Sequence, residues 1–109
     1  MNEFACPLPA PPDFSGITVL RLQPTPPLAD YLQAMQVART EAESRLDAAM
    51  LLSWYDRDRD FEAPQHVSEC HQASATPGYV DYGLNHGAHL MIDIESGRFV
   101  FFYRDAWRE

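Results

Sequence analysis

The sequence predicts an α+β fold in which one long helix packs on one face of a mostly antiparallel sheet of four to five strands, in the order β-α-β-β-β-β. Three observations predict it: one helical stripe of apolar residues near residues 28–49, apolar alternating runs on both sides of that stripe, and a C-terminal pair of runs joined by a Ser-Gly turn. Long antiparallel stretches with one helix on one face are typical of this class. Cystatin-like and hotdog-like domains share the plan, and that analogy implies no function.

The chain of 109 residues is predicted to divide near residue 16. Residues 1–16 form a proline-rich arm, since seven of the nine prolines fall within the first 27 residues. Proline breaks helices and cannot donate to a sheet, so this arm is expected to be extended. Residues 17–109 suffice for a single α+β domain with one core. Its first strand is predicted at ITVLRLQ, residues 17–23, which alternates along its length.

A helix of about 20 residues is predicted next. Pro27 suits the first turn of a helix, and Asp30 favours its positive end. The apolar stripe at three- and four-residue steps consists of Leu28, Leu32, Met35, Ala42, Leu46 and Ala49. The run AMLLSWYD follows and favours a strand, so the helix is expected to end near residue 49.

The C-terminal stretch HLMIDIESGRFVFFYR predicts a hairpin with a Ser96-Gly97 turn. Its inner pairs are then Leu90 with Tyr103, Ile92 with Phe101 and Ile94 with Phe99. The core is expected to contain Leu32, Met35, Leu46, Ile92, Ile94, Phe99 and Phe101. A further strand is predicted at GYVDYGL, residues 78–84, after a Pro77-Gly78 turn.

Composition excludes several functions. Eight basic residues against 16 acidic ones give a net charge of −8, which repels nucleic-acid phosphates and anionic lipid. All the bases are arginine, so no lysine can form a Schiff base or bind phosphate in a phosphate loop. Two cysteines, no recognisable signal peptide and no apolar run of about 20 residues predict a cytoplasmic protein outside the membrane. No cofactor is predicted.

The alternating acids of WYDRDRDFE resemble the start of a calcium loop, with Asp56, Asp58 and Asp60 at every second position. An EF-hand needs Gly and a bidentate Glu further on, where this chain has Phe61 and Val67. The sequence instead favours a strand end with solvated charges. We therefore expect the last two acids, at 58 and 60, to be exposed.

The histidine and cysteine side chains are candidate metal ligands or nucleophiles. A zinc site formed by His66, Cys70, His86 and His89 is an alternative prediction, although there is no CxxC pair and residues three apart on a strand face opposite ways. No hydrolase signature surrounds Cys70, and no catalytic residue is assigned. We expect no metal, with that set as the alternative.

Several short motifs resemble a small prokaryotic family known only as a domain of unknown function. They are Trp54-Tyr55-Asp56, Pro64, Cys70, Gly78-Tyr79, His86-Gly87 and the FVFFYR end. The resemblance spans residues 27–105 and implies no activity, cofactor or partner. It directs attention to five residues as the lining of one binding pocket: Trp54, Asp56, Cys70, Tyr79 and His86.

Two classes of function follow. The first is a small non-enzymatic binding or assembly module with no catalytic signature. The second is a small metal- or thiol-dependent enzyme that uses Cys70, His86 and Asp56.

The outer face of the hairpin predicts the assembly state. It carries Met91, Val100 and Phe102, which are too apolar for a solvated surface. We expect a homodimer through this face, because two copies can cover the same patch. The alternative cover is the arm, which brings Phe4, Leu8 and Phe14.

Overall fold

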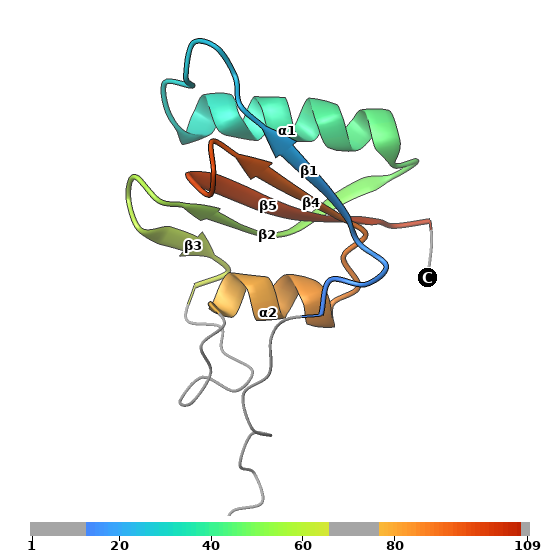
Figure 1. Cartoon of the computed structure of the whole chain (residues 1–109). Helices are drawn as coiled ribbons and strands as arrows, with labels where there is room; N and C mark the ends of the chain where they lie inside the picture. The colour runs from blue at the N-terminus through green and yellow to red at the C-terminus, as the bar shows by residue number, and fades with distance from the viewer. Residues whose placement is uncertain (1–12, 66–76, 108–109) are drawn as a thin grey trace, which may run out of the picture.

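The computed structural model describes residues 13–65 and 77–107. Its elements are β1 (Thr18–Leu22), α1 (Tyr31–Arg45), β2 (Ala49–Asp56), β3 (Phe61–Ala63), α2 (Gly78–Asn85), β4 (Leu90–Ile94) and β5 (Phe99–Asp105). The strands form one sheet in the order β1-β4-β5-β2-β3. Only β1 and β4 pair in parallel among these strands. Figure 1 shows α1 over one face of the sheet and α2 over the other.

The α+β class and the mostly antiparallel sheet are thus confirmed, and the prediction of a single helix is wrong. The predicted strand at residues 17–23 is confirmed as β1, and the AMLLSWYD strand is confirmed as β2. The short strand β3 was not predicted. Its three residues pair with the end of β2, in the register Trp54–Ala63, Tyr55–Glu62 and Asp56–Phe61.

The first helix begins later and ends earlier than the sequence predicted. Asp30 is the N-cap: its carboxylate accepts the Gln33 N–H at 3.2 Å, and the Gln33 side chain accepts the Ala29 N–H at 2.7 Å. This reciprocal cap satisfies donors at the start of the helix, so α1 begins at Tyr31 rather than at Pro27. Leu46 is already extended, with φ −119° and ψ 145°, which ends the helix after 15 residues.

The buried face of α1 is formed by three alanines, of which the predicted stripe contained only Ala42. Ala34, Ala38 and Ala42 are each 0% exposed, and their i, i+4 spacing places them on one side of the helix. Their small side chains let the helix lie close to the sheet. Leu32 is 58% exposed on the opposite side of the helix, so its predicted place in the core is wrong.

The hairpin of β4 and β5 has the predicted register. The inner pairs are Leu90–Tyr103, Ile92–Phe101 and Ile94–Phe99. Ser96 and Gly97 both have positive φ, 53° and 89°, as the tight turn between paired strands requires. The Gly97 N–H donates to the Asp93 carboxylate at 2.6 Å and fixes the turn to β4.

The predicted strand at residues 78–84 is wrong, because this segment forms α2. Its tyrosines and valine favour strands, but Val80, Gly83 and Leu84 recur at helical spacing and turn toward the sheet. Gly83 lies so close to β5 that a Cβ there would be 2.7 Å from Cγ of Phe102. The outer hairpin face is therefore covered by α2.

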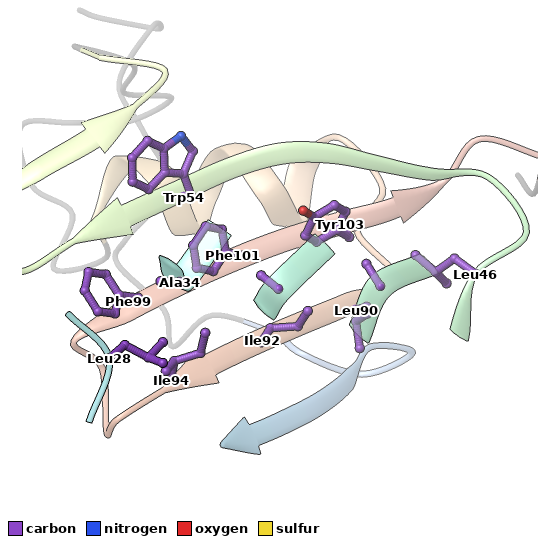
Figure 2. Packing of buried hydrophobic residues seen from close by; sticks show 12 residues of the cluster. Leu28, Ala34, Leu46, Trp54, Leu90, Ile92, Ile94, Phe99, Phe101 and Tyr103 are labelled. Atoms are coloured by element: carbon purple, nitrogen blue, oxygen red, sulfur yellow. The ribbon is translucent and has the colours of Figure 1, made fainter. Parts of the chain in front are cut away.

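Two clusters of buried side chains result, one on each face of the sheet. The cluster under α1 is the larger, and Figure 2 shows Phe99, Phe101 and Trp54 within it beside the aliphatic side chains of β4. Of the predicted core, Leu46, Ile92, Ile94, Phe99 and Phe101 are buried, and Met35 is partly buried. The second cluster joins Val80 of α2 to Val100 and Phe102 of β5.

Candidate functional site

Of the five residues predicted to line one pocket, the four that the structure describes are divided between the two faces of the sheet. Trp54 belongs to the cluster under α1, where its ring stacks on Tyr31 at 5.9 Å and on Phe101 at 5.8 Å. Tyr79 lies on α2, on the opposite face of the sheet. Cys70 is outside the described residues.

Asp56 stabilises the turn between β2 and β3. Its carboxylate is 1% exposed and accepts Arg59 Nε at 2.6 Å and the Asp58 N–H at 3.0 Å. The guanidinium of Arg59 in turn lies 3.7 Å from the centre of the Tyr31 ring, a cation–π contact with α1. This carboxylate is thus bound within the protein, with both oxygens engaged.

Asp58 and Asp60 are exposed, as expected from the sequence. Asp58 forms an ion pair with Arg98 at 2.7 Å, and hydrogen bonds from that guanidinium lower the pKa of the Asp58 carboxyl. Arg98 also donates to Glu95 at 2.8 Å and to the Leu28 carbonyl at 2.8 Å. This arginine therefore ties the β4–β5 turn to the β2–β3 turn and to the segment before α1.

The rings of the two described histidines form hydrogen bonds with backbone groups. Nδ1 of His86 lies 2.8 Å from the Tyr82 carbonyl, and its ring stacks on the Tyr82 ring at 3.9 Å. Nδ1 of His89 accepts the Asp105 N–H at 2.9 Å. His66 and Cys70 lie outside the described residues. Within the described ranges, no group of three or more His, Cys, Asp or Glu side chains could hold a metal ion.

The predicted dimer face is not exposed. Phe102 is 0% exposed and Val100 is 3% exposed within the single chain, and Met91 is partly buried beside them. The sequence left a second copy or the arm to cover this face, and in the structure α2 covers it. Phe14 adds to the cover by stacking on Phe102 at 6.5 Å. The other two arm residues named as a cover, at positions 4 and 8, are outside the described residues.

An open hollow lies where the β2–β3 edge meets the start of α2. Its volume is about 440 Å³, and it is lined by Tyr55, Asp60, Glu62, Pro77 and Tyr79. The size is within the range of small-molecule sites. Two of its walls are aromatic and two carry carboxylates, so the hollow combines apolar area with negative charge.

The β2–β3 hairpin and α2 position these walls. Tyr55 pairs with Glu62 across the hairpin, which sets both on the face toward α2. The rings of Tyr55 and Tyr79 stack at 5.0 Å with 8° between their planes. Glu62 accepts the Tyr79 N–H at 3.2 Å, and the Ser53 hydroxyl donates to the Tyr79 carbonyl at 2.7 Å. The start of α2 is thereby fixed to the sheet from both sides.

The two tyrosine hydroxyls are held in their neutral form. The Tyr55 hydroxyl donates to Asp60 at 2.8 Å, and that hydrogen bond, with some burial, raises the pKa of Tyr55. Burial raises the pKa of Tyr79 to about 12, with nearby negative charge adding to the effect. The hollow therefore presents hydroxyl groups and carboxylate oxygens at neutral pH and no cation of its own among its lining residues.

Sequence reasoning found Tyr79 and missed Tyr55, Glu62 and Pro77. A usable signal was present, because a hairpin turn at DRDRD would have placed Tyr55 opposite Glu62. The helix that brings Tyr79 onto Tyr55 was predicted as a strand, and this error concealed the hollow.

The fold and the hollow define a small domain with a helix on each face of a five-stranded sheet and an open aromatic, acidic site at one edge. No helix in the described parts of the chain is long and apolar enough to cross a membrane. The family model described as "Domain of unknown function (DUF5619)" matches residues 17–103, so this chain belongs to that family. The resemblance to a family of unknown function is therefore confirmed.

The fold has a counterpart among solved structures. The crystal structure of the novel protein AF1514 from Archeoglobus fulgidus DSM 4304 is similar, with a TM-score of 0.65 and 22% sequence identity. The similarity covers 82% of this chain and 94% of the archaeal chain. No curated protein matches this sequence.

Proposed function

We propose that the protein is a small non-enzymatic binding module that takes a cationic group, a guanidinium or an ammonium, into the hollow beside Tyr55 and Tyr79. The single observation that carries this proposal is the lining itself, two stacked tyrosines with Asp60 and Glu62 around one volume of about 440 Å³. Carboxylates pair with N–H donors of a cation, and a guanidinium or ammonium group also gains from an aromatic wall.

The charge of the whole chain supports the same ligand class. A net charge of −8 attracts cations toward the surface and repels anions. Because the hollow is open, its carboxylates are screened by salt, and the affinity for a cation is expected to fall as ionic strength rises. From the sequence we expect a cytoplasmic location and no nucleic-acid partner, and both stay predictions.

The alternative enzyme, using Cys70, His86 and Asp56, has less support from the described residues. Asp56 is bound to Arg59 on the α1 side of the sheet, whereas His86 is the C-cap of α2 on the other side. A general base must lie within hydrogen-bond reach of the group that it activates. These two side chains are separated by the sheet.

The test compares acetyl-arginine amide with acetyl-citrulline amide, which has the same shape and no charge. Calorimetric titration is expected to show binding of the arginine compound. Added salt and the Asp60→Asn/Glu62→Gln double variant are each expected to weaken this binding about tenfold. Gln and Asn keep acceptor oxygens for the Tyr55 hydroxyl and the Tyr79 N–H, so the hollow keeps its shape.

A matched control removes the same charge elsewhere. Glu41→Gln/Asp47→Asn changes two exposed or partly exposed carboxylates on α1 and in the α1–β2 connection. This variant is expected to keep at least half of the wild-type affinity. Equal affinity for citrulline and arginine, or equal loss in both double variants, would refute the proposed site.

A further inference from the structure

More than half of the outer edge of β2 has no partner strand among the described residues. On its inner side β2 pairs with β5 from Ala49 to Asp56. On its outer side β3 covers only Trp54 to Asp56. With residues 13–65 and 77–107 described, residues 49–53 form a strand edge without a partner, and such edges pair readily with other strands.

The backbone groups of this edge have a definite pattern. The Ala106 N–H donates to the Ala48 carbonyl at 2.8 Å, and hydrogen-bonded positions alternate along an antiparallel ladder. Met50 therefore directs its backbone groups inward to β5, while Ala49 and Leu51 direct theirs outward. The outward backbone groups of Ala49 and Leu51 can therefore pair with those of the same segment in a second, antiparallel copy. In that pairing Ala49 lies opposite Leu51 of the other copy, and Met50 lies opposite its own equivalent.

Side chains beside the edge fit such a contact. Met50 is 41% exposed, which is high for a large apolar residue in a strand. On the α1 side, a hollow of about 230 Å³ is lined by Met35, Arg39, Glu43, Ala49, Leu51 and Tyr103. Methionine, tyrosine and arginine are enriched at protein interfaces.

The charges beside the edge favour a second copy over a partner of opposite charge. Arg39 and Glu43 lie one helical turn apart on α1 and line the same hollow, so their charges balance locally although the whole chain carries −8. A second copy brings the same balanced pair of charges to the contact, so this part of the edge meets no excess of like charge in a two-fold dimer.

We propose that two copies of this chain pair through residues 49–53 of β2, forming one continuous antiparallel sheet across a two-fold axis at Met50. This surface replaces the outer hairpin face that the sequence suggested. It is separate from the hollow at Tyr55 and Tyr79, so either proposal can fail without the other.

The first test is the mass in solution of the full chain, by sedimentation equilibrium over the micromolar range. Wild type is expected to be a dimer, and Met50→Glu is expected to weaken it at least tenfold, because two like charges then meet on the axis. Ala49→Pro removes an N–H that the chain itself does not use in β2–β5 pairing, and is expected to act similarly while circular dichroism stays unchanged. Because each copy carries −8, salt is expected to strengthen the dimer.

The register is tested by disulfide formation in a Cys6→Ser/Cys70→Ser background. Residues facing each other in a non-hydrogen-bonded pair have Cα atoms about 4.5 Å apart, which a disulfide can span. Met50→Cys is expected to give a covalent dimer on mild oxidation. Thr18→Cys, exposed on β1 at the far edge of the sheet, is expected to form no covalent dimer. A monomeric wild type at high micromolar concentration, a dimer unaffected by Met50→Glu, or cross-linking at Thr18 alone would overturn the proposal.

Discussion

Replacing Gly83 by Ala tests whether α2 is seated on β5 as the structure describes. Alanine is favoured over glycine inside a helix by about 1 kcal/mol, so propensity alone predicts a gain in stability. The added Cβ, however, would lie 2.7, 2.8 and 2.9 Å from three atoms of Phe102. Real Cβ atoms do not approach this closely, so one of the two elements has to move.

The ring of Phe102 has little room to move. It is 0% exposed and contacts the rings of Tyr79 at 6.2 Å and Phe14 at 6.5 Å. Overpacking at such a site costs about 1–3 kcal/mol, which outweighs the helix gain. We expect Gly83→Ala to lower the free energy of unfolding by about 1 kcal/mol, with a melting temperature about 4 °C lower or more.

Urea denaturation measures this free energy, with two variants as controls. Asn85→Ala is an exposed substitution in the last turn of α2 and is expected to stabilise by about 0.5 kcal/mol. In a Phe102→Leu background, which removes the ring, Gly83→Ala is expected to become neutral or stabilising. A gain of about 1 kcal/mol from Gly83→Ala in the wild type would show that α2 does not pack on Phe102.

Three further outcomes are expected. Phe101→Ala, which removes a fully buried ring, is expected to cost about 3–5 kcal/mol in the same assay, and a loss below about 1 kcal/mol would contradict the hairpin's inner face. Absorbance at alkaline pH is expected to show one tyrosine that ionises near pH 12, and this ionisation is expected to be missing in Tyr79→Phe. Because the raised pKa of Tyr79 favours its neutral form in the folded state, stability is expected to fall as pH rises from 10 toward 12. The pKa values of the Asp58 and Glu95 carboxyls are lowered from 3.8 and 4.5, so their contribution to folding stability is present above those values and is lost as pH falls below them. Arg98→Gln is expected to flatten this acid dependence of the melting temperature. An unchanged pH profile would contradict the ion-pair network.

Local signals in the sequence sufficed for β1, β2 and the β4–β5 hairpin. The Ser96-Gly97 turn fixes the hairpin register and hence which side chains of β4 and β5 share a face, because a slip of one position would move each of them to the other face. These signals depend on near neighbours in the chain. The structure therefore reproduces the predicted register of Ile92 with Phe101.

The misplaced features depend on packing between distant segments. The predicted stripe of the first helix contains Ala42 but also Leu32, which is exposed, and it omits Ala34 and Ala38, which are buried against the sheet. The 78–84 segment has strand-forming residues and becomes a helix because Gly83 lets it dock on Phe102. Propensity is a weak prior that such tertiary contacts override.

The candidate site also depends on contacts between segments that are distant in the sequence. Tyr79 was singled out from the sequence, but its partner Tyr55 and the carboxylate of Glu62 are brought to it by β3 and α2, which were not predicted. The outer hairpin face was recognised correctly as needing a cover. The cover is α2 of the same chain, which only the structure revealed, together with Phe14 of the arm, which the sequence named as part of the alternative.

The most direct measurement of the central claim is an NMR titration of the labelled protein with acetyl-arginine amide. We expect saturable shifts confined to the backbone amides of four lining residues and their immediate neighbours, namely Tyr55, Asp60, Glu62 and Tyr79. No shifts of comparable size are expected with the citrulline compound. Arginine-dependent shifts centred on α1 or on β1, or equal shifts with both compounds, would contradict a cation site in this hollow.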